Sequence, residues 1–368
     1  TAIEFARVRL EEPELLLKDL GYDPFFHKHF ENIAADGQIP GRISFDSRNI
    51  YTVITEAGEM TAIPTGRMHY DAVDDGLPVV GDWVVVSVLD ENPPRALIHA
   101  ILPRRSVFSR KEAGKRVVEQ PVAANIDTAF VVVGLDHNFN LRRIERYLTV
   151  VWQSGANPVV VLSKSDLCDD IDGRLAQANA AAPGVPVHTV SAPTGYGFDA
   201  INSYLLPGHT VALLGSSGVG KSTIINYLLG KDVQKVKDVR EDDSRGRHTT
   251  THRQMFLLPG GGLVVDTPGM RELQLWNADD GLTDAFTDIQ SLAAGCRFTD
   301  CSHSNEPGCK VQEALETGGL DPSRFENYRK MQSELAYLAR KQDYFAAQKE
   351  KLKWKRIFKE FRKTNKKK

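Results

Sequence analysis

The sequence contains little cysteine and no long apolar run. Four cysteines among 368 residues are too few for a disulfide-dense secreted scaffold. No uninterrupted apolar stretch approaches the roughly 20 residues that span a bilayer. The first residues also lack the basic flank and apolar stretch of a signal peptide. We therefore expect a soluble, reduced, cytoplasmic monomer that has no membrane partner.

The chain also has almost no net charge, but its charges are unevenly distributed. The formal charge is −2 at pH 7, whereas residues 349–368 contain eleven Lys or Arg and two Glu, a net charge of +9. All other residues together therefore carry −11. A basic tail on an acidic body predicts an anionic partner that the tail contacts.

The pattern of apolar residues changes twice along the chain. Residues 41–109 consist of short alternating runs with turn residues between them, which predicts a small all-β barrel. Residues 128–134 and 158–162 are continuous apolar, β-branched runs on either side of an amphipathic segment at 141–153. This alternation predicts α/β architecture with strands that are buried on both faces. From about residue 279 onward we expect helices.

A glycine-rich segment follows the short apolar run at 210–214. It matches G-x-x-x-x-G-K-[ST] and leads into a helical segment at 224–229, the context that a phosphate-binding loop requires. Its backbone N–H groups and the helix N-terminus can bind phosphate oxygens. Lys221 is expected to reach the β- and γ-phosphates, and the Ser222 hydroxyl to bind Mg²⁺. The predicted nucleotide-binding residues here are Gly215, Ser216, Ser217, Gly218, Val219, Gly220, Lys221, Ser222 and Thr223. The alternative is a plain glycine turn.

A second apolar run, at 262–265, ends in the sequence Asp-Thr-Pro-Gly. The carboxylate of Asp266 at this strand end can hold magnesium through water, and the amide of Gly269 can meet the γ-phosphate. D-x-x-G alone is a common turn, but after a phosphate-binding loop it favours a nucleotide-binding role.

Two further strand ends carry residues suited to guanine. The run at 158–162 leads into Ser-Lys-Ser-Asp, and the run at 187–190 leads into Ser-Ala. The Asp166 carboxylate can accept hydrogen bonds from N1–H and N2–H of guanine, a donor pair that adenine lacks, and the Lys164 stem can stack along the base. A backbone amide of Ser-Ala can meet guanine O6. A helix cap is the alternative for the first segment. The predicted base-binding residues are Ser163, Lys164, Ser165, Asp166, Ser191 and Ala192.

These elements resemble the guanine-specific elements of Ras-like GTPases in a different chain order. In Ras-like proteins the phosphate-binding loop comes first, whereas here Asp166 and Ser191 precede Gly215. The order resembles that of circularly permuted GTPases, because strand ends can meet in space whatever their order. The first base-motif residue is usually Asn or Thr, so Ser163 is expected to tie the base loop to the phosphate-binding loop more weakly.

A charged segment, residues 231–247, contains eleven charged side chains and is expected to be mobile without ligand. A threonine just beyond it, Thr250 or Thr251, is expected to close on the γ-phosphate and Mg²⁺ when GTP binds. In Ras-like enzymes the residue after D-x-x-G is a glutamine that orients water, but here it is Met270. His248 is the candidate to replace that function, and a solvated histidine is the alternative. The candidate catalytic residues are His248, Lys221 and Thr250, and the candidate magnesium ligands are Ser222 and Thr250.

Three of the four cysteines and one histidine form the motif C-x₄-C-x-H-x₅-C. Four such ligands within fourteen residues match a closed tetrahedral zinc site with no position left open for water, which indicates one structural ion per chain. Buried free thiols or a disulfide are the alternatives. The predicted zinc ligands are Cys296, Cys301, His303 and Cys309.

The barrel, the permuted GTPase and the zinc knuckle follow one another in an order that resembles the RsgA (YjeQ) family of small-ribosomal-subunit biogenesis GTPases. The resemblance covers about residues 40–340 and is carried by the motifs at 215–223, 246–251, 266–269 and 296–309. It implies an OB-fold barrel, contacts with ribosomal RNA, a late role in assembly of the small subunit, and hydrolysis of GTP to GDP that the subunit stimulates.

The predicted fold class is multi-domain α/β, and we expect the chain to have five parts. They are an N-terminal extension (1–39), an OB-fold RNA-binding barrel (40–112), a circularly permuted Ras-like P-loop GTPase domain (113–278), a C-terminal α-helical zinc-binding domain (279–348) and a basic tail (349–368). Arg42 and Arg67 are candidate phosphate contacts of the barrel.

Three questions remain open from the sequence. A P-loop ATPase or kinase is possible if Asp166 is structural, and a non-catalytic RNA-binding protein is possible because of Met270. In the basic tail, four apolar side chains share one helical stripe, which either packs on the zinc domain or belongs to a helix that binds RNA phosphates or an anionic membrane surface. The stripe consists of Trp354, Ile357, Phe358 and Phe361.

Overall fold

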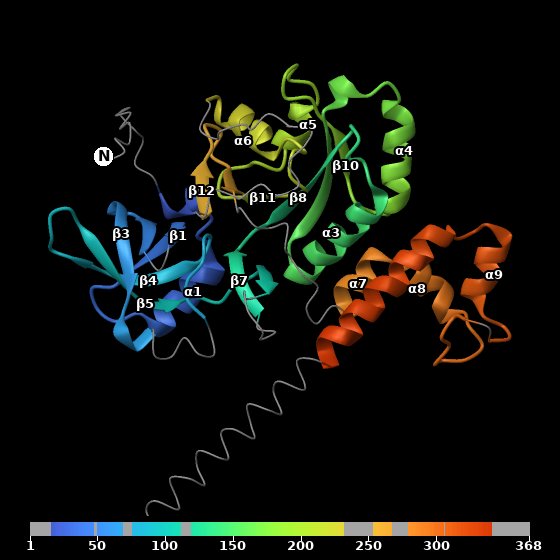
Figure 1. Cartoon of the computed structure of the whole chain (residues 1–368). Coiled ribbons are helices and arrows are strands. Elements are labelled where there is room, and N and C mark those ends of the chain that lie inside the picture. The colour runs from blue at the N-terminus through green and yellow to red at the C-terminus, as the bar shows by residue number, and fades with distance from the viewer. Residues whose placement is uncertain are drawn as a thin grey trace, which may run out of the picture.

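The computed structural model describes residues 16–47, 50–68, 76–111, 119–231, 253–266, 279–304 and 306–340. Along the chain these residues form a β-barrel, a mixed α/β sheet with helices on both faces, and a group of C-terminal helices (Figure 1). None of the described helices is long and apolar enough to cross a membrane. Most of the charged segment predicted at 231–247 and the whole basic tail lie outside the described residues.

The barrel closes in the strand order β1-β2-β3-β5-β4-β1. Strands β3 and β5 are parallel, and the other neighbours are antiparallel. Alternate side chains point inward, as period-2 patterning predicts, so that Tyr51 and Val53 of β2 are buried among Ile43, Val84 and Ile98. The predicted OB-fold barrel is therefore confirmed. The strands are β1 (Ile39–Ser47), β2 (Ile50–Thr55), β3 (Gly58–Pro64), β4 (Trp83–Leu89) and β5 (Arg95–Ile101).

Arg42 is a structural residue, so its interpretation as a surface contact for phosphate is wrong. Its side chain on β1 is only 2% exposed. It donates hydrogen bonds to the carbonyl oxygens of Gly81 (3.3 Å), Asn125 (3.0 Å) and Leu20. Burial lowers the pKa of Arg42 to about 10. The segment around Leu20, which precedes the barrel, covers Arg42, and the pattern of the strand does not predict this contact. Arg67, in contrast, is exposed.

Before and after the barrel lie small elements that connect it to the rest of the chain. A 3₁₀ helix and a ten-residue helix precede it, and a two-stranded antiparallel hairpin follows it. The hairpin is also joined to the barrel by a bridge between Val80 and Ala123. These elements are η1 (Leu17–Leu20), α1 (Pro24–Ile33), β6 (Val107–Lys111) and β7 (Glu119–Ala124).

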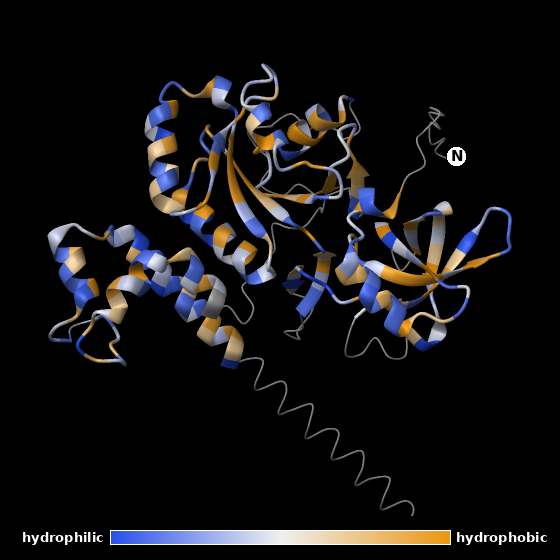
Figure 2. Ribbon diagram, turned by 180° about the vertical axis from the view of Figure 1, so that it is seen from behind, coloured by the Kyte–Doolittle hydropathy of each residue, from blue (hydrophilic) through white to orange (hydrophobic). Residues whose placement is uncertain are grey.

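The α/β part is a sheet in the order β10-β9-β8-β11-β13-β12. The first five strands are mutually parallel and β12 is antiparallel to β13. Its strands consist largely of apolar residues, which Figure 2 shows along the sheet. The strands are β8 (Thr128–Gly134), β9 (Asn157–Ser163), β10 (Val187–Thr189), β11 (Thr210–Leu214), β12 (Arg253–Leu257) and β13 (Leu263–Asp266).

Helices cover both faces of this sheet, which explains why its strands are continuously apolar. On β8, Val131 and Val133 pack in the same core as α3 and α4, whereas Phe130 and Val132 pack in the core that contains α5 and α6. Successive side chains of a strand point to opposite faces, so both faces need apolar residues. The helices are α3 (Leu141–Ser154), α4 (Ile171–Ala181), α5 (Phe198–Asn202) and α6 (Lys221–Leu229).

The barrel and the α/β sheet are joined edge to edge. Strand β1 pairs with β12 in antiparallel fashion, so that one sheet of eleven strands runs through both parts (Figure 1). Arg253 of β12 forms an ion pair with Asp46 of β1 at 3.0 Å, and both side chains are mostly buried. Strand β12 lies between the two segments predicted to respond to the nucleotide, so the barrel is hydrogen-bonded directly to the part of the chain that connects them.

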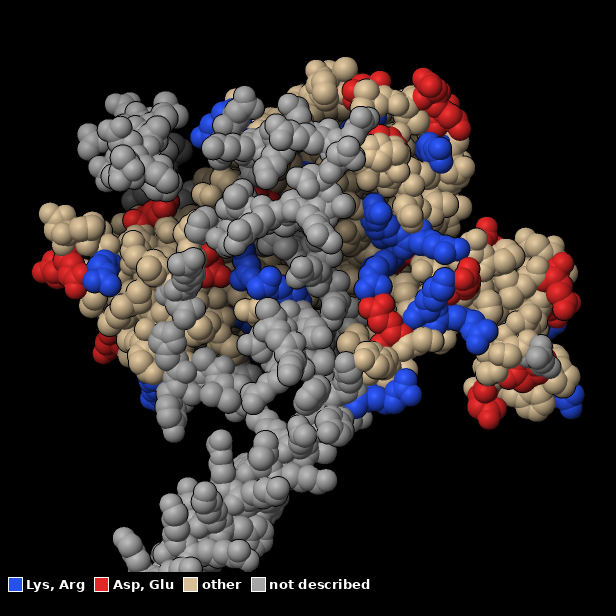
Figure 3. Space-filling view, viewed as in Figure 1, with Lys and Arg blue, Asp and Glu red and all other residues tan. Residues whose placement is uncertain are grey.

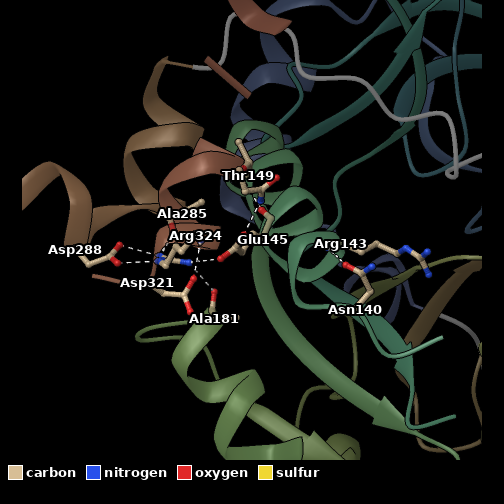
Figure 4. Close-up of polar contacts among 10 residues, drawn as sticks. Asn140, Arg143, Glu145, Thr149, Ala181, Ala285, Asp288, Asp321 and Arg324 are labelled. Carbon is tan, nitrogen blue, oxygen red and sulfur yellow. Dashed lines mark hydrogen bonds and ion pairs between the residues drawn. The ribbon is translucent and has the colours of Figure 1, made fainter. Parts of the chain in front are cut away.

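The C-terminal helices dock on α3 through a buried polar network (Figure 4). Arg324 donates hydrogen bonds to Glu145 of α3 at 2.7 Å and to both carboxylate oxygens of Asp288 at 2.7 and 2.8 Å. Asn327 donates to the second oxygen of Glu145. Glu145 and Arg324 are 4% and 9% exposed. The helices are α7 (Asp279–Ala285), α8 (Thr287–Ala294), α9 (Lys310–Thr317) and a helix over 322–340.

Arg324→Met is expected to lower the free energy of unfolding by about 3–5 kcal/mol, because it leaves the Glu145 carboxylate buried without its partner. Denaturant unfolding measures this loss, and Arg329→Met, an exposed position on the same helix, is the matched control. Adding Glu145→Gln to Arg324→Met removes both buried charges and should restore most of the stability, because the remaining carboxylate, Asp288, is 37% exposed. Equal stability of Arg324→Met and the wild-type chain would contradict this account.

Candidate functional site

The phosphate-binding loop connects β11 to α6, as predicted. Gly215 has φ 149°, and a Cβ atom there would lie 2.3 Å from the carbonyl oxygen of Val132, so only glycine fits. Gly220 has φ 96° immediately before α6. The Nζ atom of Lys221 donates to the carbonyl oxygens of Gly215 and Ser216 at 2.7 and 2.6 Å. The lysine thus lies along the concave side of a loop that ends at a helix N-terminus, where anions are favoured.

The other residues of this loop have different surroundings. Ser217 and Gly218 are exposed at the tip, whereas Val219 is buried in the core beside α5 and α6. Ser222 and Thr223 occupy the first turn of α6 and are half-buried. The loop therefore offers its tip, its backbone and the first turn of α6 to a ligand.

The two strand ends predicted to read the base lie together. Asp166 is on a 3₁₀ turn, η2 (Ser165–Leu167), and Ser191 follows β10. The Ser191 hydroxyl donates a hydrogen bond to the Asp166 carboxylate at 2.6 Å. The backbone N–H of the buried Ser165 also bonds to the carbonyl oxygen of Val190 at 3.2 Å. Asp166 itself stays exposed, and Ala192 is half-buried beside Ser191.

Ser163 links the base loop to the phosphate-binding loop. Its hydroxyl is 3% exposed and lies 2.5 Å from the carbonyl oxygen of Val219 and 3.3 Å from that of Val133. A hydroxyl has one proton to donate, and the shorter contact is the one that joins the two loops. The serine hydroxyl therefore joins the base loop to the phosphate-binding loop.

Lys164 meets a partner that the sequence analysis missed. It adopts a left-handed conformation with φ 60°, and its ammonium lies 2.7 Å from the carboxylate of Asp136, two residues beyond the end of β8. Burial raises the pKa of Asp136, but hydrogen bonds from Lys164 and Asn138 outweigh that effect and hold the pKa below its usual value. Asp136 follows a buried strand, as Asp166 does, and this position could have predicted that it lies near the site.

Asp266 ends β13, which is the direct neighbour of β11, so this carboxylate lies at the same edge as the phosphate-binding loop. Several other predicted site residues lie outside the described residues, and the structure does not test their positions. They are His248, Thr250, Thr251, Gly269 and Met270.

An arginine that the sequence did not predict also lies at the phosphate-binding loop. Arg143 is in the first turn of α3, and its Nη1 atom donates a hydrogen bond to the Ser216 hydroxyl at 2.7 Å. More than 70 residues of sequence separate Arg143 from the loop, and no sequence motif predicts the contact.

The four predicted metal ligands converge. Their ligand atoms all lie within 4.8 Å of one another. The Nδ1 atom of His303 is 3.6 Å from the sulfur of Cys296 and 3.5 Å from that of Cys309, and the two sulfurs are 3.9 Å apart. Zn–S bonds of about 2.3 Å and Zn–N bonds of about 2.0–2.1 Å in a tetrahedron would place sulfurs about 3.8 Å apart and sulfur–nitrogen pairs about 3.6 Å apart. The cluster therefore has the spacing of a four-coordinate metal site.

Local structure fixes these ligands. Cys309 caps α9, and its sulfur accepts a hydrogen bond from the backbone of Gln312 at 3.4 Å. His303 has a left-handed conformation, with φ 54°, and its carbonyl accepts from the Gln312 side chain. Desolvation raises the pKa of the Cys296 thiol, but hydrogen bonds from the backbone at the start of α9 lower it below its usual value. A helix N-terminus stabilises thiolate in this way.

Comparison with known proteins gives one consistent family. The family model described as RsgA GTPase matches residues 101–276. The small ribosomal subunit biogenesis GTPase RsgA of Opitutus terrae is 47% identical over 353 residues, which cover 94% of this chain and 96% of that protein. The protein of the same description numbered RsgA 1 from Oceanobacillus iheyensis is 46% identical over 331 residues, covering 89% and 94%.

Solved structures agree with the sequence relatives. The crystal structure of YjeQ from Thermotoga maritima has a TM-score of 0.61 and 27% identity, and the match covers 81% of this chain and 99% of that chain. YloQ, described as a circularly permuted GTPase, has a TM-score of 0.57 and 23% identity, covers 84% and 96%, and supports the fold. These matches favour a GTP hydrolase over the kinase, ATPase and non-catalytic alternatives. The chain therefore belongs to the RsgA family of circularly permuted P-loop GTPases.

Proposed function

We propose that this GTPase binds the small ribosomal subunit, acts late in its assembly, and hydrolyses GTP faster when the subunit is bound. The observation that carries this proposal is the similarity over nearly the full length of both chains to relatives described as small ribosomal subunit biogenesis GTPases. Because the similarity includes the barrel and the C-terminal helices as well as the GTPase part, it supports a shared partner as well as a shared reaction.

The proposed nucleotide is GTP or GDP with Mg²⁺. The convergence of Asp166, Ser191 and the phosphate-binding loop at one sheet edge supports a guanine site. The carboxylate of Asp166 would accept two hydrogen bonds from the base, and Lys221 would bind the β- and γ-phosphates. The further residues proposed to line the nucleotide are Ser163, Lys164, Ser165, Ala192, Gly215, Ser216, Ser217, Gly218, Val219, Gly220, Ser222, Thr223, Asp266 and Gly269.

The proposed chemistry is attack of water on the γ-phosphate. Ser222 and Thr250 would bind Mg²⁺, which neutralises charge on the phosphate oxygens, and Asp266 would hold the ion through water. Because Met270 cannot orient the attacking water, we assign that function to His248. Thr251 is the alternative to Thr250 as the second ligand of the ion.

The metal of the cysteine cluster is proposed to be zinc. Three thiolates and one imidazole suit Zn²⁺, and with all four positions occupied by protein the ion would be structural. The short distances among Cys296, His303 and Cys309 support this assignment, and Cys301 supplies the fourth ligand. The ion would hold the segment that connects α8 to α9.

The proposed ribosomal RNA contacts lie on the barrel, the zinc domain and the basic tail. OB barrels bind nucleic acid through a strand face and adjoining loops, and Arg67 remains a candidate there because it is exposed. The eleven basic residues of 349–368 would bind RNA phosphate. We propose that the protein works as a cytoplasmic monomer with the five parts 1–39, 40–112, 113–278, 279–348 and 349–368.

The rate of GTP hydrolysis is expected to rise at least tenfold when purified small ribosomal subunits are added. Phosphate release at saturating GTP measures this, and large ribosomal subunits at the same concentration are the control for a general effect of RNA. Equal rates with small subunits, large subunits and buffer alone would contradict the proposed partner, even if the chain binds GTP normally.

The purified protein is expected to contain about one zinc ion per chain by elemental analysis. Cys301→Ser should lower this content and loosen the part after about residue 285, detectable by limited proteolysis, while GDP binding persists. Cys168→Ser is the matched control, because that cysteine lies outside the cluster. A fully folded wild-type protein that contains no metal would overturn the zinc assignment.

A further inference from the structure

Arg143 occupies a defined position at the start of α3. Asn140 caps this helix, and its side-chain oxygen accepts a hydrogen bond from the backbone N–H of Arg143 at 3.1 Å. Figure 4 shows that the side chain of Arg143 points away from the network around Arg324. Glu145, two residues further along and therefore on nearly the opposite face of the helix, is held in that network. The contacts of Glu145 with the C-terminal helices therefore fix the helix that carries Arg143.

Among the described residues, Arg143 differs from two neighbouring arginines of α3, which form ion pairs with glutamates. Arg142 and Arg146 of the same helix pair with Glu326 and Glu334 at 3.2 and 2.7 Å. Figure 3 shows other places on this face of the molecule where basic and acidic side chains lie together. Among the described residues, no carboxylate forms an ion pair with Arg143, whose recorded side-chain contact is the Ser216 hydroxyl at 2.7 Å. A cation in the first turn of a helix also opposes the helix dipole, so helix stability does not explain this arginine.

Ser216 is also in contact with the phosphate-binding lysine. Its hydroxyl accepts from Arg143, and its carbonyl oxygen accepts from Lys221 at 2.6 Å. Because Lys221 of this motif reaches the β- and γ-phosphates, Ser216 lies near the γ-phosphate end of a bound nucleotide. Two cations thus bind different atoms of one loop residue, and only one of the two cations belongs to the recognised motif.

We propose that Arg143 is a positioning residue that favours the triphosphate over the diphosphate. It holds the first half of the phosphate-binding loop through Ser216, and its charge, which no carboxylate of the described residues pairs, stabilises the added negative charge of the γ-phosphate. The diphosphate lacks that group, so it gains less. The inference rests on the proposed nucleotide site and adds to it a residue that selects the nucleotide state.

The rest of the structure fits this assignment. In other GTPase classes an arginine supplied in cis stabilises negative charge on the γ-phosphate in the transition state, so a guanidinium at this loop is chemically suited to the charge of that group. Guanidinium is always protonated, so the effect requires no change in ionisation. Fixation of α3 by Glu145 and Arg324 keeps the guanidinium near the loop before the nucleotide arrives.

Arg143→Gln tests the proposal by titration of the full-length chain with a non-hydrolysable GTP analogue and with GDP, both with Mg²⁺. The affinity for the analogue is expected to fall roughly tenfold, about 1.4 kcal/mol, while the affinity for GDP changes less than twofold. Arg143→Lys, which keeps the charge, should restore most of the ratio of the two affinities. Arg142→Gln, one residue away and paired with Glu326, is the matched control and should leave the ratio unchanged.

Ser216→Ala removes the hydroxyl that accepts a hydrogen bond from Arg143 but keeps the arginine charge. Combined with Arg143→Gln, it should cause no more loss than Arg143→Gln alone, because both variants remove the same link. Equal losses for the two nucleotides, or an unchanged ratio in Arg143→Gln, would overturn the proposal. Failure of the proposed nucleotide site is a different result, because the wild-type chain would then bind neither guanine nucleotide.

Discussion

The parallel pairing of β8 with β9 on one side and β11 on the other is the constraint on which the nucleotide site depends. Val131 of β8 lies opposite both Val160 and Leu214, so the three strands end at the same edge. The phosphate-binding loop leaves β11 there, and the base motif leaves β9. The hydroxyl of Ser163 then joins the two loops through Val219. Because this convergence depends on neighbours in the sheet, the permuted chain order does not disturb it.

The other parts of the molecule attach to elements next to this edge. The barrel pairs with β12, whose flanking segments are those predicted to sense the γ-phosphate. The C-terminal helices dock on α3, whose first turn contacts the phosphate-binding loop through Arg143. Each accessory part thus contacts an element that borders the proposed nucleotide site. Coupling between nucleotide state and partner binding is a hypothesis that this arrangement motivates, and it requires two states of these elements.

The sequence predicted what depends on local pattern. The bounds of β8 and β11 were predicted correctly, because strands buried on both faces are continuous apolar runs. The cysteine cluster was predicted from ligand spacing, and the structure brings its atoms together. The meeting of Asp166 with Ser191 followed from the rule that parallel strands end at one edge. The strands β6, β7 and β12 were not predicted individually, because each contains charged or polar residues and none is a continuous apolar run like β8 or β11.

Contacts between distant segments could not be predicted from the sequence. Arg42 looked like a surface residue, but the N-terminal segment and Asn125 enclose it. Arg143 and Asp136 reach the site across the sheet edge, and Glu145 meets Arg324 from 179 residues away. Such pairings depend on how packed elements are oriented, and neither spacing nor composition records that orientation.

The central claim is that this sheet edge binds guanine through the carboxylate of Asp166, and nucleotide selectivity of Asp166→Asn tests it most directly. The Asn amide replaces one of the two accepting carboxylate oxygens with a donating NH₂ group, which faces a donor of guanine. GTP affinity should therefore fall by about 1–3 kcal/mol, whereas xanthine nucleotides should bind better than they do to the wild-type chain. Asp169→Asn, an exposed carboxylate three residues away, should behave as the wild type. Unchanged preference for GTP over XTP in Asp166→Asn would contradict the account.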